Sequence, residues 1–289
     1  AGTKVSRQPP GDRSLMPFCD LAGHSLFYTH NGVASRGANL VLIHGAGGQA
    51  RTWPATWRLA GDAARSTGLS ITPAPGRLTN QSIYAIDLPG HGHSPAPALA
   101  TIEAMADCIE AFLEALALDR VIPVGHSMGG LIALELARRA NPRLLGQVIV
   151  ASSARLAVTD QILDGLRSDF PATVDFIIKY SFDRQSAPFF PAKAREYSIA
   201  TGPDATHADF AACAAADLRP HLGEITLPTL VIASEGDRMV PVKHQQALAD
   251  ALANAECETI AGAGHYPHLE RTHPVETAIC RFTDRLAAT

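Results

Sequence analysis

The pentapeptide Gly-His-Ser-Met-Gly at residues 125–129 has the glycine spacing typical of a nucleophilic serine. Such a serine stands on a strained turn between a strand and a helix, and the two glycines leave room for that turn. An apolar run at 121–124 precedes the motif, and a helix-forming run at 131–137 follows it. This context predicts that Ser127 is the nucleophile and that the backbone N–H of Met128 stabilises an oxyanion.

A serine hydroxyl needs a base, and the base needs an acid that orients it. Asp237 follows the apolar run at 230–233, and His265 follows the apolar run at 257–261. Both therefore stand after the carboxyl end of an expected strand, where open α/β sheets bind their ligands. The chain order serine, acid, histidine predicts Asp237 as the acid and His265 as the base.

Other acidic residues are alternatives or have other expected roles. Glu235 is the alternative to Asp237 as the acid. Asp209 and Asp217 fall in a helical region and are expected at the surface. Asp87 also follows a strand-like run, but it precedes the serine in the chain, so we expect it to anchor its own loop.

Two more histidines lie close to His265 in the sequence, namely His268 and His273. His273 precedes Pro274, where a helix is expected to begin, so we predict a helix-capping or surface role for it. His265 therefore remains the predicted base.

A glycine-rich loop at residues 44–48 follows an apolar run and is expected to supply the second oxyanion donor. We predict the backbone N–H of Ala46 for this role, with that of Gly47 as the alternative. A phosphate-binding loop is excluded because no Lys-Ser or Lys-Thr pair follows the glycines. His44 is expected to be structural.

Short, continuous apolar runs alternate with helical stretches along the chain, which favours strands buried on both faces of a parallel sheet. The runs are 40–43, 83–86, 121–124, 148–150, 230–233 and 257–261. The early segment 18–33 alternates instead and contains Asn31-Gly32, which predicts an antiparallel start to the sheet. The expected fold class is α/β: a mostly parallel central sheet covered by helices on both faces.

Residues 153–222 have helical periodicity and no strand-like run, so they are predicted to form a helical cap inserted into the core. The core itself is expected at 16–152 and 223–289, after a polar tail at 1–15. Residues 61–81 form a long irregular stretch, a type of loop that is usually functional or mobile.

Composition excludes several other classes of protein. The formal net charge is −4 with no long basic run, so nucleic-acid binding has no electrostatic basis. No apolar run has the length of a membrane span. The five cysteines are odd in number and lack CxxC spacing, which argues against a disulfide framework and a metal site. With no apolar leader near residue 1, the expected location is the cytoplasm.

Five motifs together resemble the α/β-hydrolase superfamily, in its single-domain capped branch. They are HGAGG at 44–48, DLPGHGHS at 87–94, GHSMGG at 125–130, GDRMVP at 236–241 and GAGH at 262–265. The resemblance implies an α/β-hydrolase fold, a catalytic triad of Ser127, Asp237 and His265, and no cofactor. The stretch 61–81 departs from the usual family pattern by its length.

The expected activity is hydrolysis of a carboxylic ester or related acyl compound through an acyl-enzyme intermediate. The cap supplies six aromatic side chains, some of which are expected to face the pocket; the alternative is that most of them pack the cap on the core. They are Phe170, Phe176, Phe182, Phe189, Phe190 and Tyr197. A mostly apolar pocket favours an uncharged or hydrophobic small-molecule substrate. Carbon–carbon bond hydrolysis, enol-lactone opening and peracid formation use the same triad and are alternatives. The C–C hydrolases tend to have Asn where this chain has His126. A ligand receptor without turnover is a further alternative.

Overall fold

The structure is a computed structural model that describes residues 17–21, 23–34, 37–59, 78 and 81–287. The predicted tail at 1–15 lies outside the described residues. So does most of the long stretch predicted at 61–81. Of the described residues in that stretch, Leu78 is fully buried.

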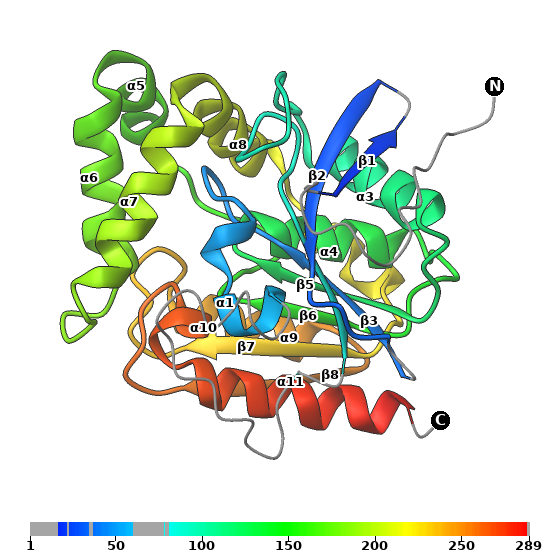
Figure 1. Cartoon of the computed structure of the whole chain (residues 1–289). Helices are drawn as coiled ribbons and strands as arrows, with labels where there is room; N and C mark the ends of the chain where they lie inside the picture. The colour runs from blue at the N-terminus through cyan, green and yellow to red at the C-terminus, as the bar shows by residue number, and fades with distance from the viewer. Residues whose placement is uncertain (1–16, 22, 35–36, 60–77, 79–80, 288–289) are drawn as a thin grey trace.

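Eight strands form one sheet in the order β1-β2-β4-β3-β5-β6-β7-β8 (Figure 1). Their bounds are β1 Phe18–Leu21, β2 His24–His30, β3 Asn39–Ile43, β4 Ser82–Ile86, β5 Val121–His126, β6 Gln147–Val150, β7 Thr229–Ser234 and β8 Ala255–Ile260. The pairs from β4 to β8 are parallel, whereas β2 is antiparallel to both β1 and β4. The mostly parallel sheet with an antiparallel start is confirmed.

The connection between β1 and β2 includes Gly23, whose φ of 93° is the left-handed conformation that favours glycine. The Asn31-Gly32 pair instead follows β2. There the side-chain oxygen of Asn31 accepts the N–H of Ile83, 3.1 Å away, and so ties the end of β2 to β4.

Both faces of the central strands are buried, which explains their continuous apolar runs. In β3, Val41 and Ile43 belong to one hydrophobic cluster, and Leu40 and Leu42 belong to the cluster on the opposite face. Successive side chains of a strand point to opposite faces, so both sets of side chains in a strand covered on both sides are buried and mainly apolar.

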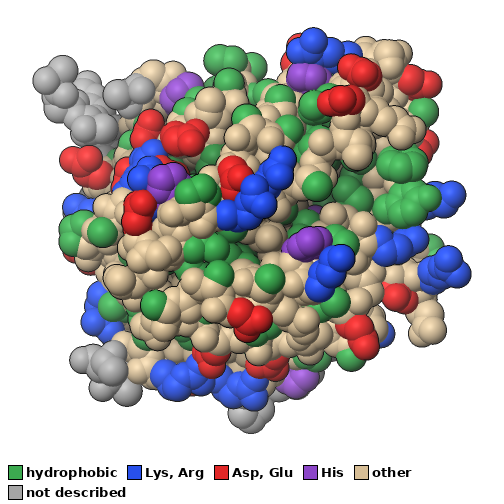
Figure 2. Space-filling view, turned by 180° about the vertical axis from the view of Figure 1, so that it is seen from behind, with side chains coloured by type: hydrophobic (Ala, Val, Ile, Leu, Met, Phe, Trp, Pro, Cys, Tyr) green, Lys and Arg blue, Asp and Glu red, His purple; other side chains and the backbone are tan. Residues whose placement is uncertain are grey.

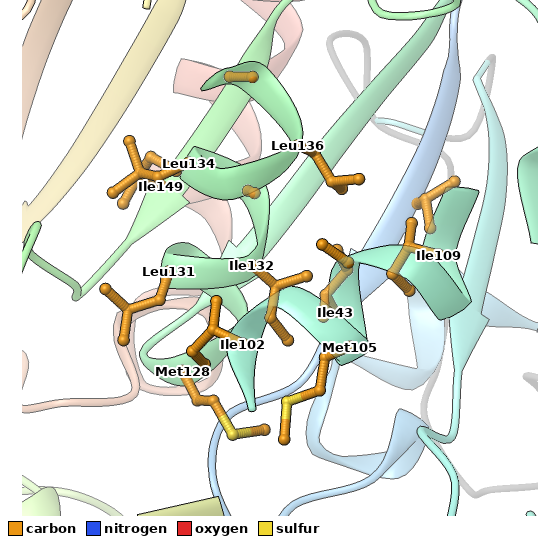
Figure 3. Close-up of a cluster of buried hydrophobic side chains, with 14 of the residues drawn as sticks. Ile43, Ile102, Met105, Ile109, Met128, Leu131, Ile132, Leu134, Leu136 and Ile149 are labelled. Atoms are coloured by element: carbon orange, nitrogen blue, oxygen red, sulfur yellow. The ribbon is translucent and has the colours of Figure 1, made fainter. Parts of the chain in front are cut away.

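Helices cover both faces of this sheet (Figure 1). The first face packs against α3 (Ile102–Ala115), α4 (Met128–Arg138) and α9 (Val242–Ala251). The second packs against the short helix α1 (Ala55–Arg58) and the C-terminal helix α11 (Thr272–Ala287). Figure 3 shows α3 and α4 directing Met105, Ile109 and Ile132 into the first cluster. This packing fixes the start of α4, where Ser127 lies.

Four helices stand between β6 and β7 and lie at one side of the molecule, in the segment predicted to be the cap (Figure 1). They are α5 Asp160–Ser168, α6 Phe170–Ser181, α7 Phe189–Thr201 and α8 Pro203–Ala215, followed by the 3-10 turn η3 Arg219–Glu224. All residues from 153 to 222 are described, and none of them is in a strand. The cap has a small cluster of its own, which Tyr266 from the core joins.

The surface carries charges of both signs. On the face shown in Figure 2, Lys and Arg side chains are interspersed with Asp and Glu side chains instead of gathering by sign. Within the described ranges, no helix is both long and apolar enough to cross a membrane.

Candidate active site

Ser127 stands on the sharp turn between β5 and α4, with φ 51° and ψ −114°. A non-glycine residue is strained in this left-handed conformation, so its surroundings must hold it there. A Cβ on Gly125 would lie 2.0 Å from the carbonyl oxygen of Gly129. A Cβ on Gly129 would lie 2.2 Å from the carbonyl oxygen of Ile43. The two glycines therefore let helix α4 pack against β3 and β5 closely enough to form the turn.

Asp237 and His265 lie together at the carboxyl ends of β7 and β8. The Nδ1 atom of His265 is 2.8 Å from Oδ2 of Asp237, and both side chains are buried. Oδ1 of Asp237 accepts the N–H groups of Met239 and Val240, and Oδ2 also accepts Nε2–H of Gln245. With Nδ1–H donated to Asp237, the Nε2 atom of His265 is left as a proton acceptor.

Ser127 and His265 line the same small cavity, of about 50 Å³, between the core and the cap. The cap contributes mainly apolar walls, from Leu156, Ala157, Val158, Ile177, Phe210 and Cys213. The remaining lining residues are Gly45, Ala46, His126, Ser181, Met239, Val240 and Tyr266. No Lys, Arg, Asp or Glu is among the described residues that line it.

The loop after β3 lies beside Ser127, since a Cβ on Gly45 would lie 3.2 Å from Cβ of Ser127. Ala46 lines the cavity, and its N–H donates to none of the described residues. The N–H of Gly47 donates to a carboxylate of Asp209, 2.8 Å away, and is not available to a ligand. Met128 is the first residue of α4, where an N–H has no acceptor within the helix.

His44 connects the loop after β3 to the loop after β4. Its Nε2 accepts the N–H of Leu88 at 3.1 Å, and its Nδ1 is 2.9 Å from the carbonyl oxygen of Gly45. Burial, reinforced by the nearby charge of His91, lowers the pKa of His44 to about 4. The ring is therefore neutral at neutral pH, and its contacts are structural.

Asp87 also connects the segment after β3 to the segment after β4. Its carboxylate accepts the N–H groups of Ala50 and His93. A Cβ on Gly92 would collide with this carboxylate, at 2.1 Å from Oδ2. Asp87 thus anchors the segment that follows β4, the role expected from the sequence.

The surface position predicted for Asp209 is wrong. Asp209 is fully buried and pairs with His91, whose Nε2 lies 2.8 Å from its Oδ2. The sequence hid this because α8 has almost no hydrophobic asymmetry, so its periodicity did not reveal which side faces the core. Asp217 does lie near the surface, where it pairs with Arg219.

The alternatives to the predicted acid and base are placed elsewhere. Glu235 and His273 are exposed. His268 is buried, and its Nε2 lies 3.2 Å from the carbonyl oxygen of Thr52. Burial lowers the pKa of His268 to about 3, which keeps it neutral.

His126 contacts His265 from behind, which sequence reasoning did not foresee. Its Nε2 is 2.7 Å from the carbonyl oxygen of His265, and the side chain is fully buried. Burial, together with the neighbouring His268 and His265, holds the pKa of His126 well below its ordinary value. The neutral ring therefore donates its Nε2–H to that carbonyl and supports the histidine loop.

Glu270 in the short helix α10 (Pro267–Glu270) also holds the loop of His265. Its Oε1 accepts the N–H groups of Gly264 and Tyr266, the neighbours of His265. Two groups of the cap donate to its second oxygen: the N–H of Asp183 and the hydroxyl of Ser186. The N–H of His265 itself donates to the carbonyl oxygen of Ser181 in the cap, 2.6 Å away.

The six cap aromatics do not line the cavity, so the expectation that some of them face the pocket is wrong. Phe176 and Phe189 are exposed, and Phe182 stacks on Tyr266 with ring centroids 4.7 Å apart. The other three are Phe170, Phe190 and Tyr197. The cavity's aromatic side chains are Phe210 and Tyr266. Within the described ranges, no group of three or more His, Cys, Asp and Glu side chains could hold a metal ion.

Comparison with known proteins identifies the family of this chain. Residues 40–278 match the model of the alpha/beta hydrolase family. The chain is 30% identical to a pimeloyl-acyl-carrier-protein methyl ester esterase of Photobacterium profundum, over 83% of this chain and 92% of that one. It is 25% identical to the biotin biosynthesis bifunctional protein BioHC of Cellvibrio japonicus, over 86% of this chain but only 48% of that longer protein.

Among solved structures, the enol-lactonase from Burkholderia xenovorans LB400 matches with a TM-score of 0.80 and 25% identity, over 93% of this chain and 100% of that one. Fold and relatives together define a hydrolase of the esterase kind. The chain belongs to the alpha/beta hydrolase family.

Proposed function

We propose that this protein hydrolyses an uncharged, largely apolar carboxylic ester with Ser127, Asp237 and His265 as its catalytic triad. The observation that supports this proposal is the cavity: Ser127 and His265 line it together, and no charged side chain of Asp, Glu, Lys or Arg is among its described lining residues. An apolar wall around one nucleophile favours a substrate without charge near its ester bond.

In the proposed mechanism, Oγ of Ser127 attacks the ester carbonyl carbon while Nε2 of His265 takes the serine proton. The backbone N–H groups of Ala46 and Met128 stabilise the oxyanion. His265 then gives its proton to the departing alcohol, which leaves an acyl-enzyme. A water molecule, activated by the same histidine, releases the acid. Asp237 stays ionised and holds the imidazole through its Nδ1–H.

We propose that the chain divides into a catalytic core and a cap, because the segment between β6 and β7 is helical and lines the cavity. Residues 16–152 and 223–289 form the catalytic core, and residues 153–222 form the cap that closes the cavity.

All five cysteines are free thiols, which suits a reducing compartment, and we place the protein in the cytoplasm on that ground.

The test is turnover of p-nitrophenyl esters of increasing acyl-chain length by the wild type and by Ser127→Ala. We expect the variant to lose at least about a thousandfold in kcat, because the nucleophile is removed while the fold is kept. Ser168→Ala is the matched control, since Ser168 is an exposed serine of the cap helix α5. Turnover that persists in Ser127→Ala at the wild-type rate would contradict the proposal.

A lactone is the second candidate substrate, because the enol-lactonase from Burkholderia xenovorans LB400 matches nearly the whole chain. Opening a lactone uses the same steps, except that the alcohol remains tethered to the acyl group. An enol-lactone assayed beside the linear esters separates the two classes by their kcat/KM ratio. A vinylogous diketone in the same series tests C–C hydrolysis through loss of its chromophore.

A further inference from the structure

The buried carboxylate of Asp209 comes from the cap and reaches the loop beside the nucleophile. Its Oδ2 atom accepts the N–H of Gly47 at 2.8 Å and is 2.8 Å from Nε2 of His91. The side chain of Asp209 is completely buried and that of His91 is 1% exposed. One oxygen of the cap helix α8 therefore joins two loops of the core, which are 162 and 118 residues away in the sequence.

The contacts of His91 indicate that this pair is ionic. Its Nδ1 lies 3.1 Å from the carbonyl oxygen of Pro89, and its Nε2 contacts the carboxylate. Both partners are acceptors, so both ring nitrogens must carry hydrogens, which makes the ring an imidazolium. Burial works against this charge, but the charge and hydrogen bond of Asp209 outweigh it and raise the pKa of His91.

Gly47 is fixed from several sides. Its φ of 66° is a left-handed conformation, and a Cβ there would lie 3.0 Å from a methyl carbon of Thr206 in α8. The N–H of Gly48 donates to the carbonyl oxygen of Gly45 at 3.0 Å, which closes the turn around Ala46. A hydrogen bond to a carboxylate is about twice as strong as one between neutral groups, so the Asp209 contact is a strong constraint on the Gly47 peptide.

We propose that Asp209 is a positioning residue for the oxyanion loop. By holding the N–H of Gly47, it keeps that peptide turned away from the cavity and aims the preceding N–H, that of Ala46, at the substrate oxygen. The cap thereby takes part in transition-state stabilisation as well as in closing the cavity. This inference rests on the proposed function, in which the N–H of Ala46 is an oxyanion donor.

The experiment compares four variants by ester kinetics and by inhibition with a trifluoromethyl ketone. Ser127 Oγ adds to the ketone carbon and His265 takes its proton, so the resulting hemiketal oxyanion reports on the oxyanion donors. Asp209→Ala removes the acceptor for Gly47. Asp209→Asn keeps an oxygen there without the charge. Asp204→Ala is the matched control, an exposed acid on the same helix.

The fourth variant guards against misfolding. Asp209→Ala leaves a buried imidazolium without its partner, whereas replacing both members of a buried ion pair by apolar groups is often tolerated. The double variant His91→Phe with Asp209→Leu therefore removes the acceptor for Gly47 without leaving an unpaired charge. Thermal unfolding checks that each protein is folded.

For Asp209→Ala and the double variant, we expect kcat to fall about a hundredfold, as for loss or misplacement of one oxyanion donor. KM should change by less than about threefold, and the inhibition constant of the ketone should rise in parallel with the loss of kcat/KM. Asp209→Asn should stay within about tenfold of the wild type, because its amide oxygen can accept the N–H of Gly47.

A folded variant without the acceptor that keeps kcat and ketone inhibition within about threefold of wild type overturns the inference. A loss confined to KM does so too, since it would reveal a role in substrate binding alone. Inactive Ser127→Ala beside a fully active Asp209→Ala rejects only the inference. Active Ser127→Ala rejects the proposed function and the inference with it.

Discussion

His126 stands in the serine motif, but its structural role comes from a contact with the distant His265. Its ring donates to the carbonyl oxygen of His265 and packs against the rings of His265, Tyr266 and His268. The residue directly before the proposed nucleophile therefore supports the loop of the proposed base. Two members of the site that are far apart in the chain thus share one buried contact.

We expect His126→Phe to keep the packing but leave the carbonyl oxygen of His265 without this donor. The predicted loss is about 1–3 kcal/mol in the free energy of unfolding, and about tenfold in kcat because the base is held less firmly. Urea unfolding and ester kinetics measure the two effects. A loss of stability with unchanged kcat would show that His126 supports the fold only. His273→Phe, at an exposed histidine, is the control.

At this scale, the sequence revealed residues whose surroundings are local. The strained turn at Ser127 was predictable because its glycines, strand and helix are all adjacent in the chain. The partners of Gly47 and His265 could not, because Asp209 is 162 residues from the first and His126 is 139 residues from the second. Tertiary packing brings such pairs together, and neither the periodicity nor the spacing of the sequence predicts them.

The elements β3, β5 and α4 meet at two glycines, and their packing depends on them. Adding one methyl group at Gly129 forces it to within 2.2 Å of a backbone oxygen of β3, which cannot move without distorting the sheet. We expect Gly129→Ala to lose at least about 3 kcal/mol in the free energy of unfolding, or to fail to fold.

Gly223→Ala is the matched control, because nothing lies within 4 Å of a Cβ at that position. It should change the free energy of unfolding by less than about 1 kcal/mol. Chemical denaturation of both variants tests the difference. Equal stability of the two would mean that helix α4 can shift away from β3, contrary to the close approach described above.

Helices and strands were predictable where the sequence pattern indicates both the type of element and the side that is buried. Continuous apolar runs identified the central parallel strands, since strands buried on both faces are mainly apolar. The edge strand β8 lacks such a run, because Glu256 and Glu258 interrupt it and much of it is exposed. The cap helices were recognised as helices, but their buried sides were not. Phe176 and Phe189 look like pocket residues by type, yet both are exposed. Residue type alone does not reveal which neighbour a helix will meet.

The molecule as a whole buries several histidines in neutral form, and this makes its stability depend on pH. Burial lowers the pKa of His44 to about 4 and that of His268 to about 3, and the pKa of His126 is also lowered. In the unfolded chain these groups titrate near a pH of about 6.5. Their contribution to stability is therefore complete above that pH and is lost as the pH falls towards the folded-state values.

Between about pH 6 and pH 4.5, we expect the free energy of unfolding to fall by up to about 1.4 kcal/mol per pH unit for each such histidine. Urea unfolding over this range measures the slope. His268→Gln should make the slope shallower by about one histidine's share, whatever its effect on stability at neutral pH. An unchanged slope would contradict the assignment of His268 as a buried neutral group.

Glu270 gives the cap a second attachment, at the loop of His265, separate from the one that Asp209 makes to the loop after β3. It binds the loop of His265 with one oxygen and the cap with the other. A cap attached to both loops cannot swing aside without disturbing the proposed catalytic residues. New substrate ranges in this protein should therefore arise, in evolution or in the laboratory, by exchanging wall residues such as Leu156, Val158 and Ile177, and not by loosening a hinge.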